Sequence, residues 1–257
     1  MEKIFVRLSI VTLFAIIGST PIAFGEVFIQ NDQRYVGDDG SLHIVGEIKN
    51  NLNAPLNQVS IKATLYDENN SIIGTKETSS LVNTIMPSMK GPFDFVLTDS
   101  ESKKTQTYSL DINYKVSTPK SQEIDITSSK LSRDKLNNLM ITGTVANNGD
   151  ITANTIAIIA TLYDKAGNVA AVSRVHPEPD YLRTEEQAFF LLTVPDKTQT
   201  IEIQDYSLIA ESEEYATVPE FPFSVMVLLC GTLSAYIGIT KFSKGVIANL
   251  IAASNPK

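Results

Sequence analysis

Cysteine, histidine and tryptophan are scarce in this chain of 257 residues. Its only cysteine is Cys230, so no intrachain disulfide and no cysteine-based metal site can form. Its only histidines are His43 and His176, and tryptophan is missing altogether. No Gly-rich phosphate loop, GxSxG elbow or HExxH segment occurs. These absences leave few routes to metal catalysis through imidazoles or to histidine-based acid/base chemistry.

Acidic residues are missing from both ends of the chain, where residues 1–25 and 221–257 contain only Glu2. The middle therefore holds 28 of the 29 Asp and Glu residues but 16 of the 21 Lys and Arg residues, a net charge of −12 for residues 26–220. Such an acidic segment repels phosphate backbones, so we expect no nucleic-acid partner. With 43% hydrophobic and 19% charged residues, the chain has the composition of a folded protein.

The first 25 residues have the pattern of a secretory signal peptide. Lys3 and Arg7 precede an almost wholly apolar run over residues 8–18, and the small-residue stretch Ala23-Phe24-Gly25 follows. A basic start, an apolar run of about 7–15 residues and a small-residue exit are typical of a cleaved signal. We expect cleavage after Gly25, with a retained signal anchor as the alternative.

A second apolar segment lies near the C-terminus. Residues 221–240 carry no charge, and 20 residues at 1.5 Å each can cross a hydrocarbon core of about 30 Å. Lys241 and Lys244 follow this segment, and an acidic stalk over residues 211–220 precedes it. The positive flank predicts a transmembrane helix over 221–240, a cytoplasmic tail over 241–257 and residues 26–220 outside the cell. A buried core helix is the alternative.

The entrance to the predicted span carries a short motif, Pro219-Glu220-Phe221. Motif, span and lysine cluster together resemble the PEF-type C-terminal sorting signals of archaeal surface proteins. The resemblance implies cleavage near the motif by an archaeosortase and transfer to an envelope anchor. A plain C-terminal membrane anchor without processing is the alternative.

The middle of the chain is a duplicated unit. A shift of 97 residues aligns residues 63–67 with the identical run at 160–164, a run too long for chance inside a matching frame. The same shift pairs Leu42 with Leu139, Ile44 with Ile141, Gly46 with Gly143, Asn50 with Asn147, Asn51 with Asn148, Asn57 with Asn154 and Ile61 with Ile158. A period of this length is a whole domain rather than a solenoid repeat.

Within each unit, apolar residues alternate with polar ones. Leu42, Ile44, Gly46 and Ile48 form one alternating set, and Val59, Ile61, Ala63 and Leu65 form the next. Short alternating segments separated by turn residues predict antiparallel β-sandwiches with one buried face per sheet. We therefore predict an all-β fold of two immunoglobulin-like sandwiches over 26–117 and 122–210, joined by a linker over 118–121 and followed by the stalk and the transmembrane helix.

Both units carry the motif Leu-Tyr-Asp before a predicted hairpin turn, at Leu65-Tyr66-Asp67 and at Leu162-Tyr163-Asp164. With the preceding Gly and Asn-Asn, the pattern resembles the FxLYD family of extracytoplasmic immunoglobulin-like modules, although Ala63 and Ala160 replace the aromatic residue. We interpret the motif structurally. The leucine fills the core, the tyrosine covers the opposite side of the sheet and the aspartate caps turn amides.

Several residues could bind a metal ion, but their spacing in the sequence is not typical of a metal site. Met86 and Met89 could bind Cu(I), but we favour packing on one end of the sandwich. Oxygen ligands for Ca²⁺ could come from Asp38, Asp39, residues 67–70, Glu178, Asp180, Glu185 and Glu186, but none has the spacing of a dedicated loop. His43 and His176 are not repeated, and we expect both at the surface. We predict no catalytic residue and no cofactor.

These observations predict a non-enzymatic interaction or structural protein on the cell surface of an archaeal envelope. Duplicated modules on a stalk present sheet edges and end loops to partners without needing reactive side chains. The expected partners are the membrane, an archaeosortase and a surface protein or glycan. The alternative is an envelope binding protein for a metal ion or a small solute.

Overall fold

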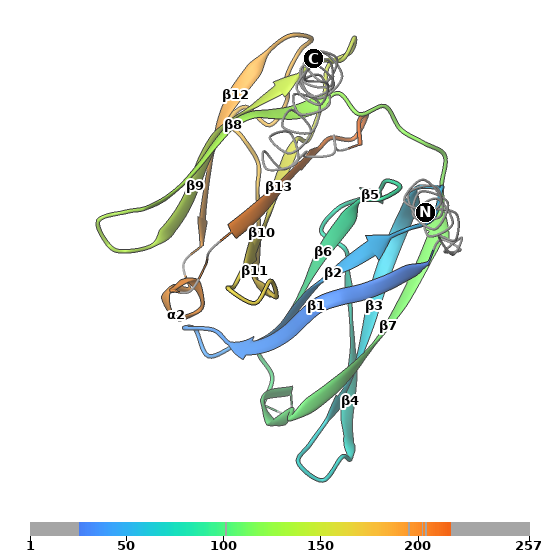
Figure 1. Ribbon diagram of the computed structural model, residues 1–257, viewed down its shortest axis with the longest axis vertical. Coiled ribbons are helices and arrows are strands. Elements are labelled where there is room, and N and C mark those ends of the chain that lie inside the picture. The colour runs from blue at the N-terminus through green and yellow to red at the C-terminus, as the bar shows by residue number, and fades with distance from the viewer. Residues whose placement is uncertain (1–25, 101, 195, 202, 204, 217–257) are drawn as a thin grey trace, which may run out of the picture. The chain divides into compact units, whose positions relative to one another are not determined.

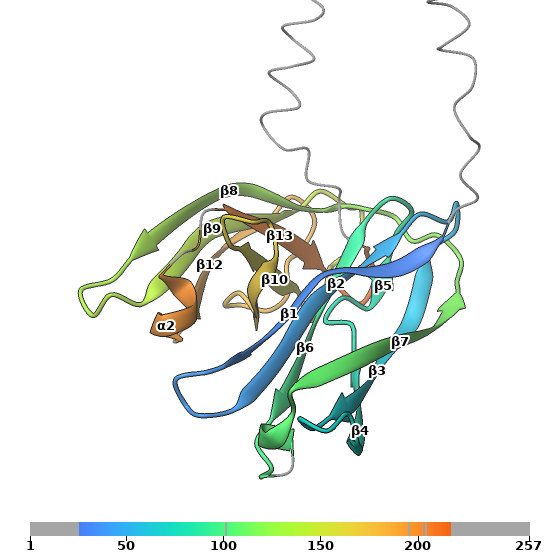
Figure 2. The same ribbon diagram turned by 60° about the horizontal axis from the view of Figure 1, so that its bottom comes forward.

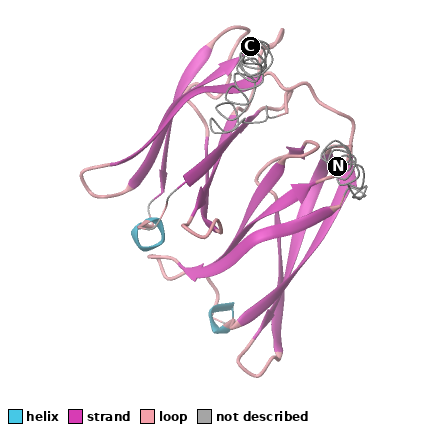
Figure 3. Ribbon diagram, viewed as in Figure 1, coloured by secondary structure: helices cyan, strands magenta, loops and turns pink. Residues whose placement is uncertain are grey.

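The protein is nearly all β. The computed structural model describes residues 26–100, 102–194, 196–201, 203 and 205–216, and all of these belong to the first of two compact units, residues 1–218 and 219–257. Strands dominate these residues, with one-turn helical pieces at η1 (Ser102–Lys104) and α2 (Lys197–Thr200) (Figures 1 and 3). The prediction of a β fold built from antiparallel sheets is confirmed for the described part of the chain.

The N-terminal half contains two antiparallel sheets. Sheet A has the order β1-β2-β6, formed by Val27–Val36, Leu42–Asn50 and Lys90–Leu97. In sheet B, β3 (Leu56–Tyr66) pairs with β4 (Ile72–Ser79), β5 (Thr84–Ile85) and β7 (Thr107–Val116). The inward side chains of both sheets form one buried cluster that includes Leu42, Ile61, Leu65, Phe93 and Phe95.

The C-terminal half repeats this pattern. Sheet C has the order β12-β9-β8, formed by Gln187–Val194, Leu139–Asn147 and Ile124–Arg133. Sheet D has the order β11-β10-β13, formed by Val169–Val175, Ala157–Tyr163 and Asp205–Glu211. Their shared cluster includes Ile141, Ile158, Leu162, Phe190 and Leu208. At the shift of 97 residues, β2 corresponds to β9, β3 to β10 and β6 to β12.

The repeated glycine of each unit lies beneath an aromatic ring. Gly46 of β2 is paired with Phe93 of β6, and Gly143 of β9 is paired with Phe190 of β12. A Cβ atom at Gly46 would lie 2.7 Å from the Phe93 ring, and one at Gly143 would lie 2.6 Å from the Phe190 ring. Because real Cβ contacts are longer, both sites require glycine so that the phenylalanine can cross the strand.

The repeated asparagine forms the same buried hydrogen bonds in both halves. The Asn50 side chain donates to the carbonyls of Ala54 and Ile85 at 3.0 and 2.9 Å and accepts from the Leu52 amide. Asn147 likewise donates at 2.9 Å to the carbonyls of Ile151 and Leu182 and accepts from the Gly149 amide. Both asparagines are fully buried. The sequence pattern suggests turn residues, but these side chains hold loops together inside the fold.

The structural interpretation of the Leu-Tyr-Asp motif is confirmed for leucine and aspartate. Leu65 and Leu162 are buried in the two apolar clusters. The Asp67 carboxylate accepts hydrogen bonds from the amides of Asn69 and Ser71. Asp164 caps the amides of Ala166 and Asn168 in the same way. The two tyrosines differ from each other and are treated below.

The first residues of the predicted acidic stalk, 211–216, are part of the fold. Glu211 is the last residue of β13 and is buried, and Tyr215 and Ala216 are only 4% and 1% exposed. The Glu213 amide donates to the Asn154 carbonyl, and the Tyr215 hydroxyl accepts from the Ile151 amide. The stalk prediction is therefore wrong for 211–216, because Tyr215 packs in the apolar cluster of the C-terminal half and Ala216 packs in that of the N-terminal half.

Several predicted segments lie outside the described residues: the signal peptide over 1–25, the motif Pro219-Glu220-Phe221, the helix over 221–240 and the tail over 241–257. Within the described residues, no helix is long and apolar enough to span a membrane.

Candidate functional site

The two halves contact each other along a mixed apolar and polar surface, which we call the seam. Its apolar part joins Val82, from the loop before β5, to Ala157, Ile159 and Ile209 on the outer face of sheet D. The Arg174 guanidinium of β11 donates to the Leu81 carbonyl at 3.2 Å. The outer face of sheet A lies at this seam, which explains why the outward residues Val45 and Glu47 of β2 are buried although alternation predicts that they face solvent.

A buried carboxylate lies at the centre of the seam. Glu47 of β2 is 1% exposed, and its carboxylate lies 2.8 Å from the ammonium group of Lys90 on β6. The Tyr163 hydroxyl, from the other half, donates a hydrogen bond to the same carboxylate. Gln30 and Asn31 donate to it from β1 at 3.3 and 3.4 Å. A buried carboxylate with this many donors is compensated and joins two distant segments of chain.

The repeated tyrosine has therefore acquired different roles in the two halves. Burial raises the pKa of Tyr163, and the nearby negative charge of Glu47 raises it further. The ammonium group of Lys90 also lies 5.2 Å from the centre of the Tyr163 ring. The equivalent Tyr66 contacts the Ser109 hydroxyl at 3.3 Å on an exposed face of sheet B. The predicted covering role suits Tyr66, whereas Tyr163 belongs to the seam.

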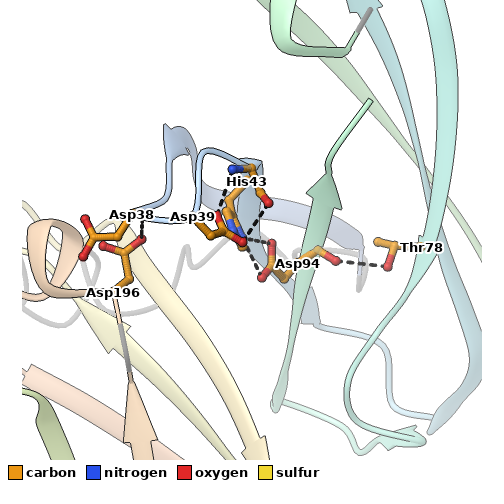
Figure 4. A network of polar contacts seen from close by, with 7 residues as sticks. Asp38, Asp39, His43, Thr78, Asp94 and Asp196 are labelled. Carbon is orange, nitrogen blue, oxygen red and sulfur yellow. Dashed lines mark hydrogen bonds and ion pairs between the residues drawn. The ribbon is translucent and has the colours of Figure 1, made fainter. Parts of the chain in front are cut away.

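His43 is not a solvated surface histidine as the sequence suggested. Its Nδ1 atom lies 3.0 Å from the Asp94 carboxylate (Figure 4). Its ring stacks on that of Tyr35, with 4.8 Å between the ring centroids and an interplanar angle of 3°. The hydrogen bond with Asp94 raises the pKa of His43 against the opposing effect of burial, and the negative charges of Asp39 and Asp196 act in the same direction as Asp94. The alternation correctly placed His43 on the outer face, but the neighbouring strand and hairpin cover it.

A second polar contact joins the hairpin after β1 to α2. The Asp38 carboxylate accepts from the Lys197 amide at 2.8 Å and from the Thr198 hydroxyl at 2.6 Å. In return, the Asp38 amide donates to the Asp196 carboxylate at 3.2 Å, at the N-cap of α2 (Figure 4). The hydrogen bond from Thr198 is the largest cause of a lowered pKa for Asp38.

Glu211 is a further buried carboxylate of the seam. It is 2% exposed, and its oxygens accept from the Asn83 amide at 3.0 and 3.1 Å. Burial raises its pKa, while the amide hydrogen bond and the charge of Arg174 oppose that shift. The sequence suggested a solvated stalk residue here. Its actual role is to hold the loop of the N-terminal half against β13.

A separate groove of about 500 Å³ lies in the N-terminal half between β1 and β7. Aromatic rings from Phe28, Tyr108 and Tyr114 line it, together with the carboxylates of Asp32 and Asp111. The Tyr108 hydroxyl donates to Asp32 at 2.8 Å, and burial raises the pKa of this tyrosine. Aromatic faces beside hydrogen-bonding carboxylates suit a small polar solute. The alternation of β7 contained a signal for this groove. Its alternate residues lie on one face of the strand, and four of them line the groove: Tyr108, Leu110, Ile112 and Tyr114.

The predicted metal candidates do not come together. Met86 and Met89 are 8% and 9% exposed and belong to the apolar cluster of the N-terminal half, which confirms the packing interpretation. Asp38 and Asp39 are occupied by hydrogen bonds, the latter with Ser41. Across the described residues, no group of three or more His, Cys, Asp or Glu side chains is placed to hold a metal ion.

The remaining predicted metal-binding candidates are His176 and the acidic residues near it in the sequence. His176 is exposed and pairs through Nδ1 with the Ile156 carbonyl at 2.7 Å. Glu186 accepts from the Arg183 amide, and Glu178, Asp180 and Glu185 are exposed. These positions fit the solvated interpretation of the acidic residues.

The repeat contains a signal that sets Glu47, Lys90 and Asp94 apart, although it does not tell what they contact. At the shift of 97 residues, Glu47 corresponds to Thr144, Lys90 to Gln187 and Asp94 to Leu191. These charged residues occur in one unit and not in the other, although both units share their core positions. Charges that distinguish two copies of one fold mark surfaces that the copies use differently.

Comparisons with known proteins give one family match. A family model described as "Protein of unknown function (DUF3426)" matches residues 121–204, which cover most of the C-terminal half. No relative is found among the curated proteins.

Solved structures are matched only loosely. Exo-chitosanase CsxA of Amycolatopsis orientalis is 12% identical, with 76% of this chain and 26% of that one covered and a TM-score of 0.28. Red sea bream transglutaminase is 10% identical, with 76% and 30% covered and a TM-score of 0.24. This chain thus spans less than a third of either protein. Likeness at this level supports no argument about activity.

Proposed function

We propose that this chain is a non-enzymatic interaction or structural protein, anchored at the cell surface of an archaeal envelope, that presents two immunoglobulin-like β-sandwich modules to its partners. The anchoring part rests on the signal-like residues 1–25, the motif Pro219-Glu220-Phe221 and the uncharged run over 221–240. The FxLYD-like motif and the matching strand order of the two halves support the module part.

One observation carries the non-enzymatic part of the proposal. The buried carboxylates Glu47 and Glu211 both accept hydrogen bonds from the opposite half of the chain, and the repeated tyrosine at 163 supplies one of them. Groups used in this way stabilise one arrangement of two modules. A rigid pair of modules presents edges and loops at a defined spacing, which is what an interaction protein requires.

The test is crosslinking on intact cells, followed by identification of the captured partner. An epitope near Asp150 should be accessible to protease on intact cells, and protection of that epitope would overturn the surface location. The intact mass of the purified protein separates sorting from plain anchoring. Loss of the residues beyond about Glu220 supports archaeosortase processing, whereas a retained Lys257 leaves only the plain anchor.

The second candidate function is binding of a small solute, which the groove between β1 and β7 favours. A bound solute should shield the rings of Tyr108 and Tyr114 from solvent and quench their fluorescence. Tyr114→Ala should weaken such binding and leave the fold intact, because Tyr114 is 37% exposed. Tyr66→Ala, on the same sheet but away from the groove, is the matched control.

A further inference from the structure

Strand β12 is a free edge of sheet C that carries no charge. It pairs with β9 on one side, and no other strand of the described residues pairs with it (Figure 2). Its outward side chains include Phe189 and Leu191, which are 60% and 48% exposed. An edge strand points unpaired N–H and C=O groups outward, so an uncharged apolar edge is a template for another strand.

The same chain shows what a protected edge looks like. Strand β6 is the counterpart of β12 and occupies the equivalent edge of sheet A. At the shift of 97 residues, its Lys90, Pro92 and Asp94 stand where β12 has Gln187, Phe189 and Leu191. Charged residues and proline are the usual means of blocking strand addition. The two copies of one fold therefore differ at three positions along this edge, where β6 has residues that oppose strand addition and β12 has none.

The other edge strands are also charged. Every edge strand of more than two residues in the four described sheets, apart from β12, has at least one charged side chain, for example Asp32 in β1, Lys76 in β4 and Lys130 in β8. Residues 26–220 have a net charge of −12, so most surfaces of two copies repel each other. At an uncharged edge, two acidic copies can approach each other without bringing like charges together.

We propose that β12 pairs antiparallel with β12 of a second copy of this chain, forming one continuous sheet across a two-fold axis. Phe189 of one copy then lies opposite Leu191 of the other, twice, so that the four apolar side chains pack side by side on the outer face of the joined sheet. Residues directly opposite in an antiparallel pair share a face, so this register also keeps inward residues inward. A two-fold pair uses both free edges and closes on itself. The proposal does not depend on the proposed cell-surface location.

The test is a cysteine scan of the full-length chain in a Cys230→Ser background, performed on the solubilised protein so that membrane topology does not matter. Single cysteines replace the outward residues Gln187, Phe189, Leu191 and Thr193. Opposite Cβ atoms in paired strands lie about 4.5–5.5 Å apart, close to disulfide distance, and the separation grows quickly away from that position. Mixing Phe189→Cys with Leu191→Cys chains should give several times more disulfide dimer than Thr193→Cys alone.

Two further variants check that the dimer depends on this edge. Leu191→Asp copies the residue of β6 and should weaken dimerisation at least tenfold by sedimentation velocity. Leu136→Asp adds the same charge at another exposed leucine of this half, 71% exposed, and should leave dimerisation unchanged. A wild-type chain that stays monomeric at about 0.1 mM, where a Kd of about 10 µM gives mostly dimer, overturns the proposal. So do equal crosslinking at all scanned positions and a dimer that Leu191→Asp does not affect.

Discussion

The hydroxyl of Tyr163 donates a hydrogen bond to the carboxylate of Glu47, a residue 116 positions earlier in the chain and in the other half of the fold. Tyr66, which holds the same place in the first copy of the repeat, forms only an exposed contact with Ser109. Duplication provided two identical Leu-Tyr-Asp runs, and one tyrosine now joins the two copies. The contacts of this pair predict how single substitutions should behave.

Tyr163→Phe should destabilise the protein more than Tyr66→Phe does. The first change removes a hydrogen bond to a buried carboxylate, which contributes about 1.5–3 kcal/mol to the free energy of unfolding. The second removes an exposed contact and should cost less than about 0.5 kcal/mol. Urea unfolding of the two variants measures both values. Equal effects would contradict a special role for Tyr163 at the seam.

Lys90→Met should be more harmful than Lys76→Met. Lys90 faces Glu47, which is 1% exposed, so its loss leaves a buried carboxylate without a countercharge. Lys90 is itself 36% exposed and other donors remain on Glu47, so we expect a cost of about 2–3 kcal/mol. Lys76 pairs with Asp99 at 2.9 Å on the surface, where both side chains are well exposed, and its replacement should change little. Thermal melting of both variants checks the contrast.

His43 should make stability depend on pH near neutrality. Its folded-state pKa is raised, chiefly by the hydrogen bond with Asp94, above the unfolded value of about 6.5. A raised folded-state pKa adds stability that is fully present below about pH 6.5 and is lost as pH rises through the folded-state value. Asp94→Asn should therefore flatten the stability profile above about pH 6.5, where the unfolded-state imidazole loses its proton and the folded-state one retains it.

The control for this pH effect is Asp99→Asn, which removes a carboxylate of the same half that lies away from His43. Unfolding free energies at several pH values, together with NMR titration of the His43 ring, give the measurement. If the unfolding free energy of Asp94→Asn depends on pH as steeply as that of the parent, the pair His43–Asp94 is not the source of the pH effect.

Asn147→Asp should be strongly destabilising although it changes one atom. The Asn147 side chain donates to the carbonyls of Ile151 and Leu182, and an aspartate would place a buried carboxylate against those two acceptors. We expect a loss of about 3 kcal/mol or more. The neighbouring Asn148 is exposed, so Asn148→Asp should stay within about 0.5 kcal/mol of the parent. Denaturant unfolding compares the two, and a similar loss in both variants would argue against the buried network.

Much of the local structure could be predicted from the sequence because the strand patterns of the duplicated unit occur twice in the chain. Alternation in Val59, Ile61, Ala63 and Leu65 predicted a strand with one buried face, and all four side chains are buried. The aspartate of the Leu-Tyr-Asp motif predicted a capped turn, because an aspartate side chain reaches the amides of its own turn. These features depend on residues that are close in the sequence, so the sequence alone is enough to predict them.

The seam and the free edge were decided by tertiary structure. Whether Glu47 faces water or another sheet depends on where β10 lies, more than a hundred residues away, and no periodicity reports that. The same holds for His43, which sequence placed on a polar face but which Tyr35 and Asp94 cover. Alternation specifies which residues share a face. Only the packing of the two halves determines which of those faces remain in solvent.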